Sequence, residues 1–69
     1  MGQIKYRIRE LRKAQGLSQE KLARALKVHT HNISNWERGV YRPTNKHRVE
    51  LCVVLKCQLS ELETLDHSG

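Results

Sequence analysis

Residues 18–39, SQEKLARALKVHTHNISNWERG, constrain the fold of this chain more than any other segment, because they predict two short helices joined by a tight turn. Ser18 is a favourable N-cap for the first helix, since its hydroxyl can accept a hydrogen bond from a free amide of the opening turn. Glu20 places a negative charge near the positive end of that helix dipole. The expected inward side chains are Leu22, Ala23 and Leu26, followed by Val28.

The second helix of the pair is expected over residues 30–38, with Ile33 and Trp36 inward and Gly39 just past its C-terminus. Its outer side carries short polar side chains that donate and accept hydrogen bonds: Thr30, His31, Ser34 and Asn35. These residues are mediocre helix formers, so their presence on one face favours contact with a partner over plain solvation. A helix fits the major groove of B-DNA, where base edges present donors and acceptors.

Three further helices are predicted outside this pair. Residues 3–15 carry an apolar stripe at i, i+4 and i+7, made by Ile4, Ile8 and Leu11. A fourth helix is expected to begin after an N-cap at Thr44 and to run to about Leu55, and a fifth is expected over 59–64, with Leu62 inward. The expected inner residues of the fourth helix are Val49, Leu51, Cys52 and Leu55. No strand candidate is evident, so the prediction is an all-α, compact five-helix domain over 1–64 with a frayed tail over 65–69.

The chain is basic, with 13 Lys and Arg against seven Asp and Glu and a net charge of +6. Residues 1–56 carry all of the basic groups and four of the acidic ones, whereas 57–69 carry only acidic charges. A basic body suits a polyanion such as DNA, RNA or an anionic membrane surface. The length of 69 residues allows one domain with a small core.

No apolar run is long enough for a signal peptide or a membrane span, so neither is expected. Two cysteines without an export signal are expected to be reduced thiols. Cys52 and Cys57, taken with His29 and His31, lack the spacing of a known zinc module, and both cysteines are preferred as core residues. No nucleophile–base pair, metal set or phosphate-binding glycine loop is evident, so no catalysis, cofactor or small-molecule substrate is predicted.

Over residues 4–62 the chain resembles the Cro/cI-type (XRE-like) family of helix-turn-helix DNA-binding domains. The segments IRELRKAQGLSQ and LSEL match the family in type and spacing near either end. Within the helix pair the matching residues are Leu17-Ser18-Gln19, Leu22-Ala23, Leu26, Val28, Ile33-Ser34 and Trp36-Glu37-Arg38-Gly39. The resemblance implies a lambda-repressor-like fold with residues 30–38 as the recognition helix. It also implies a bacterial, phage or plasmid protein of the cytoplasm that acts at the nucleoid.

The resemblance assigns DNA contacts position by position. Base reading is implied for Thr30, His31 and Asn35, followed by Ser34 and Asn32. Asn35 is the strongest of these, because an Asn amide can pair bidentately with adenine. Phosphate contact is implied for Gln19, Arg38 and Arg42 and, more weakly, for Arg12. Two alternatives stay open: Arg42 as a solvated loop charge, and Trp36 as core, not a stacking platform.

The chain departs from the family pattern at several positions. Lys27 and Lys56 stand where the family usually has glycine, so a positive φ at either would cost on the order of 1 kcal/mol. His29 stands where Ser or Thr usually caps the recognition helix, which makes Thr30 an alternative cap. Asn45 and Arg48 replace usually apolar residues of the fourth helix, so that edge of the core is expected to be thinner.

Two function classes remain open. The first is sequence-specific double-stranded DNA binding in transcription, favoured by the polar helix face and the basic body. The second is a protein-interaction module of the same fold, such as an antitoxin or a coactivator-like adaptor, which would use the acidic end with Leu59, Leu62 and Leu65. Because family members commonly bind inverted half-sites as dimers, a weak homodimer through the C-terminal segment, strengthened on DNA, is the expected alternative to a monomer.

Overall fold

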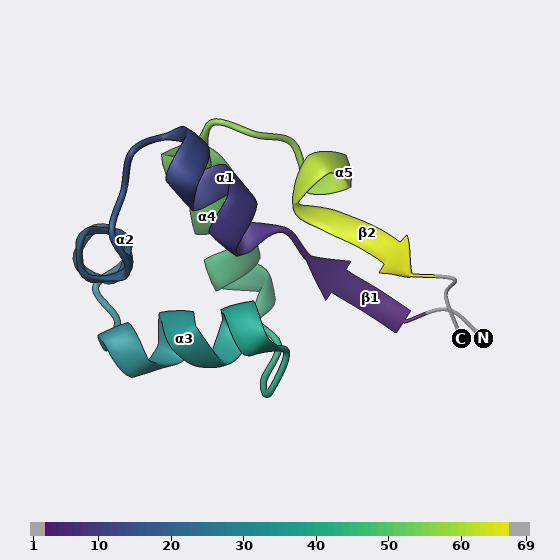
Figure 1. Cartoon of the computed structure of the whole chain (residues 1–69), viewed down its shortest axis with the longest axis horizontal. Helices are drawn as coiled ribbons and strands as arrows, with labels where there is room; N and C mark the ends of the chain where they lie inside the picture. The colour runs from purple at the N-terminus through teal and green to yellow at the C-terminus, as the bar shows by residue number, and fades with distance from the viewer. Residues whose placement is uncertain (1–2, 67–69) are drawn as a thin grey trace.

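The computed structural model describes residues 3–66, and side chains are described from Lys5 to Thr64 (Figure 1). Its elements are, in chain order, β1 (Gln3–Tyr6), α1 (Ile8–Ala14), α2 (Gln19–Leu26), α3 (Thr30–Arg38), α4 (Asn45–Leu55), α5 (Leu59–Leu62) and β2 (Glu63–Asp66). The five predicted helices are therefore present, and the mostly helical fold is confirmed. The longest of them has 11 residues, and within the described chain none is long and apolar enough to cross a membrane.

The helix pair forms where its local signals place it. The Ser18 hydroxyl accepts a hydrogen bond from the Lys21 N–H at 3.1 Å and begins α2. Lys27 ends α2 in the left-handed conformation, with φ 57°, and Gly39 ends α3 with φ 75°. Lys56 ends α4 in the same way, with φ 54°. Both lysines thus adopt the positive φ that glycine would take at lower cost.

The N-terminal residues differ from the prediction, because 3–6 form a strand and not the first turns of a helix. β1 pairs with β2 in an antiparallel two-stranded sheet, in the register Gln3↔Asp66, Ile4↔Leu65, Lys5↔Thr64 and Tyr6↔Glu63. The sheet projects from the helices on the side away from α2 (Figure 1). The expectation of no strand was wrong because β1 gains its hydrogen-bond partners from residues about 60 positions away, which no local pattern reveals.

The C-terminal boundary shifts for the same reason. α5 ends at Leu62, two residues earlier than predicted, and the Leu62 carbonyl accepts a hydrogen bond from the Arg7 N–H at 2.9 Å. Leu65 and Asp66, which the sequence assigns to a frayed tail, lie in β2. The rest of that predicted tail, 67–69, lies outside the described residues.

The core is built from residues of all five helices: Ile8, Leu22, Ala23, Leu26, Ile33, Trp36, Leu51, Leu55 and Leu62. Trp36 is therefore core, as predicted, while Val28, Cys52 and Cys57 are half-buried against it. Val49 was predicted to face inward and is instead 58% exposed. Leu51 and Leu55 define the inner stripe of α4, and Val49 lies two residues, or about 200°, around the helix from Leu51.

Polar contacts connect α4 to strand β2. Arg48, predicted to thin this edge of the core, is half-buried and forms an ion pair with Glu63 of β2. It also donates a hydrogen bond from Nη1 to Oδ1 of Asn45 at 2.6 Å. The positions that are usually apolar in the family therefore carry a polar link between α4 and the strand.

Candidate nucleic-acid interface

The outer side of α3 carries the residues that the sequence selects for base reading. His31 and Asn32 are exposed, and Thr30 and Ser34 are half-buried. The first turn of α3 therefore presents a hydroxyl, an imidazole and an amide next to one another in sequence. Asn35, one turn after His31, lies apart from this set because it is only 6% exposed.

Asn35 is the predicted base reader whose surroundings differ most from expectation. Its side-chain Oδ1 accepts a hydrogen bond from Nη2 of Arg38 at 2.7 Å. Its carbonyl accepts one from the Val40 N–H at 2.9 Å, where the chain folds back after α3. Bidentate pairing with adenine needs an accessible amide edge, which the buried Asn35 side chain does not present. In this structure Asn35 is therefore a residue that positions Arg38.

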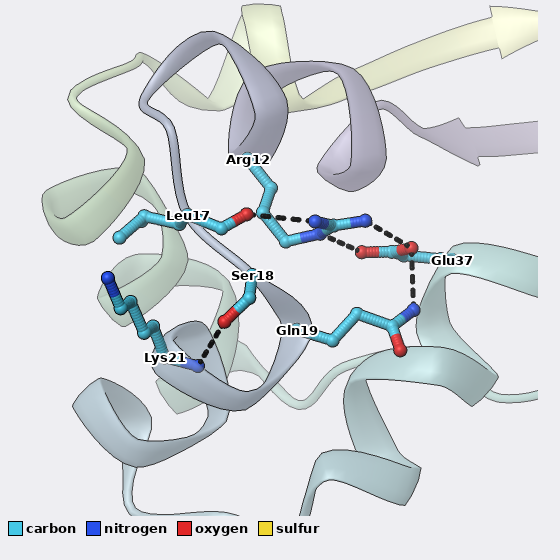
Figure 2. A network of polar contacts seen from close by, with 6 residues as sticks. All are labelled: Arg12, Leu17, Ser18, Gln19, Lys21 and Glu37. Atoms are coloured by element: carbon cyan, nitrogen blue, oxygen red, sulfur yellow. Dashed lines mark hydrogen bonds and ion pairs between the residues drawn. The ribbon is translucent and has the colours of Figure 1, made fainter.

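Arg12 differs from its predicted role in phosphate binding. It is 8% exposed, and all three of its guanidinium nitrogens have partners within the protein. Nε and Nη2 donate to the Glu37 carboxylate at 2.7 and 3.3 Å, and Nη1 donates to the Leu17 carbonyl at 2.8 Å (Figure 2). Because the side chain is buried and each guanidinium nitrogen is bonded within the protein, Arg12 is poorly placed for phosphate contact. The sequence could not show this, because Glu37 lies 25 residues away.

Gln19 joins the same network from the start of α2. Its Nε2 donates to Oε1 of Glu37 at 3.0 Å, so Glu37 accepts from both α1 and α2 (Figure 2). Because Glu37 belongs to α3, these bonds connect α3 to both preceding helices. The side chains of Arg12 and Glu37 are only 10% and 5% exposed, and the pairing compensates for the cost of burying both charges.

Two further cations lie at and beyond the end of α3. Arg38, in its last turn, and Arg42, in the following loop, are both exposed. Tyr41 and Val40 in the same loop are also exposed, at 64% and 54%. Arg38 thus lies at the C-terminal end of α3, Arg42 lies in the loop that follows, and residues 30–32 lie at the N-terminal end of the helix.

His29 caps α3, although His is not a favoured N-cap. Its backbone is extended, with φ −72° and ψ 143°, and its Nδ1 accepts a hydrogen bond from the His31 N–H at 3.1 Å. Thr30 is therefore the first residue of the helix and does not replace His29 as the cap. The two imidazole rings meet edge to face, with centroids 6.4 Å apart. The sequence signal for this cap was only its position directly before the helix.

The cysteines and histidines named in the zinc alternative lie on different elements. His29 and His31 are at the start of α3, while Cys52 and Cys57 are at the end of α4 and just beyond it. Among the described residues no three His, Cys, Asp or Glu side chains gather closely enough to hold a metal ion. Burial, followed by the proximity of Cys52, raises the pKa of the Cys57 thiol from 9.0 to about 11.

Comparisons with known proteins agree with this arrangement. The HTH-type transcriptional regulator DicA of Escherichia coli is 45% identical over 51 residues, which are 74% of this chain and 38% of DicA. The chain therefore spans less than half the length of that relative. A crystal structure of a presumed DNA-binding protein from Bacteroides fragilis has the same fold, with a TM-score of 0.84, 18% identity, and coverage of 90% of this chain and all of that one.

A family model described as helix-turn-helix matches residues 8–62, which run from the first residue of α1 to the last of α5. That match covers more than half of the chain and includes the whole α2–turn–α3 unit. The chain belongs to the helix-turn-helix family, in agreement with its resemblance to Cro/cI-type (XRE-like) domains.

Proposed function

We propose that this chain binds double-stranded DNA in a sequence-specific way and acts in transcriptional regulation, with α3 as the recognition helix in the major groove. The exposed polar first turn of α3 carries this proposal, because the N-terminal residues of a recognition helix contact base edges. The net charge of +6 favours association with a polyanion. The name of the relative DicA, a transcriptional regulator, supports the same role.

The proposed base-reading residues are those that α3 exposes first. His31 and Asn32 are exposed, and the half-buried Thr30 and Ser34 can contribute their hydroxyl groups. Asn32 replaces Asn35 as the amide best placed for bidentate pairing with adenine, because its side chain is exposed. Asn35 would read a base only if its amide, 6% exposed in this structure, became accessible.

The proposed phosphate contacts are Arg38, Arg42 and Gln19. Arg38 and Arg42 are exposed cations near the end of α3. Gln19 is half-buried, and its Nε2 carries a second N–H besides the one donated to Glu37. These contacts would give affinity and register but little sequence information.

The proposal requires no catalytic group, cofactor, small-molecule substrate or membrane. It places the protein with the nucleoid in the cytoplasm of a bacterium, encoded by the host, a phage or a plasmid. A homodimer on inverted half-sites would supply the specificity that one recognition helix lacks.

A surface on α4 and α5 supports weak self-association. Three apolar side chains there are 58%, 73% and 43% exposed: Val49, Val53 and Leu59. They line an open groove together with Cys52, Lys56, Cys57, Gln58 and Glu61. In a two-fold dimer Lys56 of one copy could face Glu61 of the other. Leu62, predicted to serve a partner, is fully buried and unavailable.

The same apolar surface favours the second candidate function, a protein-interaction module. A cluster of exposed apolar side chains can mark a site for self-association or a site for a different protein partner. The two functions differ in their dependence on DNA. A partner-binding module would show either no duplex binding or binding without sequence preference.

In vitro selection from a random duplex pool at near-physiological salt tests the proposed function. The wild-type chain is compared with Asn32→Ala and with Asn35→Ala, each checked for an unchanged unfolding transition. We expect a short motif from the wild type and loss of one base preference with Asn32→Ala. If no motif emerges while duplex binding rises steeply at low salt, DNA binding is nonspecific. The protein-interaction module is then the favoured function.

A further inference from the structure

The cap of α3 determines which nitrogen of His29 carries the proton. Nδ1 accepts the His31 N–H at 3.1 Å, so that atom has its lone pair directed at the backbone. In a neutral imidazole one nitrogen accepts while the other carries the hydrogen. The tautomer compatible with this cap therefore has its hydrogen on Nε2, at the far end of the ring.

That Nε2–H has no partner among the described side chains. His29 is exposed, and within residues 5–64 the only hydrogen bond of its side chain is the one that Nδ1 accepts. Its ring also contacts the ring of His31 edge to face, with centroids 6.4 Å apart. The cap bond also holds the ring in place, so a partner that accepts from Nε2 would meet a side chain that is already oriented.

The position of this donor connects it to the proposed interface. His29 directly precedes Thr30 and His31, and its exposed ring stands at the same end of α3 as the exposed Asn32. DNA presents acceptors there in two forms, phosphate oxygens and purine N7 or O6 atoms of the major groove. A Ser or Thr would cap α3 equally well, but its short side chain would offer no second donor at this distance.

We propose that His29 is a DNA-contact residue, which caps α3 through Nδ1 and donates from Nε2–H to an acceptor on the duplex. The inference rests on the proposed function and adds a residue to its contact set. It gives one side chain two functions that substitutions can separate. A role confined to capping would affect folding stability alone.

Three substitutions separate the functions. His29→Ser keeps a capping oxygen and removes the distant donor, His29→Asn keeps a cap and an N–H donor, and His29→Ala removes both. Binding is measured by fluorescence anisotropy with the duplex selected by the wild-type chain, and stability by urea unfolding. We expect His29→Ser to fold as well as the wild type and to bind about five- to tenfold more weakly, the loss of one hydrogen bond. His29→Asn should recover part of that affinity.

The outcomes are distinguishable. If the wild type binds no duplex, the proposed function fails independently of His29. If the wild type binds and His29→Ser binds equally tightly, His29 is only a cap and the inference is overturned. If His29→Ser folds poorly, His29→Asn decides, because an Asn variant that folds well and binds no better than His29→Ala also overturns it.

Repeating the in vitro selection with His29→Ser shows which group on the duplex accepts the hydrogen bond from Nε2–H. Loss of preference at one base position identifies a base edge as the acceptor. A uniform loss of affinity with an unchanged motif identifies a phosphate oxygen. Both results support the contact.

Discussion

Arg12 of α1 and Glu37 of α3 form a buried, two-point ion pair across 25 residues of chain, with N–O distances of 2.7 and 3.3 Å. Leu17 and Gln19 satisfy further groups of the same pair. α3 is thereby attached to the N-terminal half of the domain through its own last turn. Its orientation depends on polar contacts as well as on the apolar core.

Arg12→Ala should destabilise the domain by about 3–5 kcal/mol, because it leaves the Glu37 carboxylate buried without its partner. Glu37→Ala should have a similar effect, and the double variant should lose less than the sum. Urea unfolding of the three variants measures these differences. Arg7→Ala is the matched control, since the Arg7–Glu10 pair is 44% and 69% exposed and should contribute less than about 0.5 kcal/mol. An equal loss of unfolding free energy in Arg12→Ala and Arg7→Ala would contradict a special contribution of the buried Arg12–Glu37 pair.

Lys27→Gly and Lys56→Gly should each raise the free energy of unfolding by up to about 1 kcal/mol, because glycine takes a positive φ without the Cβ clash. Gly39→Ala is the reverse control. An added Cβ at Gly39 meets nothing within 4 Å, so its expected loss of about 1 kcal/mol comes from φ alone. Thermal and urea unfolding measure all three variants. A loss of stability in Lys27→Gly would show that the positive φ at residue 27 does not strain the lysine.

Arg42→Gln should weaken binding to all duplexes alike and reduce the slope of log affinity against log salt by about 1. This follows if Arg42 contacts a phosphate, whereas a solvated loop charge would leave the slope almost unchanged. Arg9→Gln, an exposed position on α1, is the matched control for net charge. Anisotropy titrations at several salt concentrations give both slopes. An equal reduction in the two variants would assign the effect to net charge alone.

Cys57 should react slowly with iodoacetamide in the folded protein, because the thiolate is the nucleophile and burial raises the thiol pKa to about 11. Between pH 9.0 and about 11 the folded state binds more protons than the unfolded state, so the free energy of unfolding should fall as pH rises through this window. Cys57→Ser should remove that part of the slope. Mass spectrometry of the alkylated peptide, with and without urea, measures the reactivity. Equal rates in both conditions would contradict the raised pKa.

Val53→Lys should reduce self-association without affecting the fold, because Val53 is 73% exposed and lines the α4–α5 groove. Sedimentation equilibrium, with and without the selected duplex, compares it with the wild type. We expect a weak wild-type dimer that strengthens on DNA and a variant that stays monomeric. Arg24→Glu, an exposed change on α2, controls for charge. A tight wild-type dimer without DNA that survives Val53→Lys would exclude this groove as the interface.

The residues of the helix pair were predictable from sequence because their signals are local. Ser18 caps α2 by reaching an amide three residues away, and the apolar spacing of Leu22 and Leu26 is a property of one helix. The positive φ at Lys27 follows from the turn between two such helices. Gly39 ends α3 for an equally local reason.

Tertiary structure alone decided which polar groups remain available. Asn35 and Asn32 share a helix and a residue type, yet only Asn32 is exposed, because exposure depends on what else packs around the end of α3. In the sequence Arg12 resembles the other basic residues of its segment. Only the folded chain brings Glu37 into contact with it and buries the pair.

The terminal strands show the same division. Residues 3–6 continue a helical apolar spacing, but pairing with 63–66 satisfies their backbone groups in an extended conformation. Helical periodicity and caps act within one or two turns, and the sequence by itself determined what they control. Strand pairing, ion pairing and burial join residues 25 to about 60 positions apart, and these only the folded chain could decide.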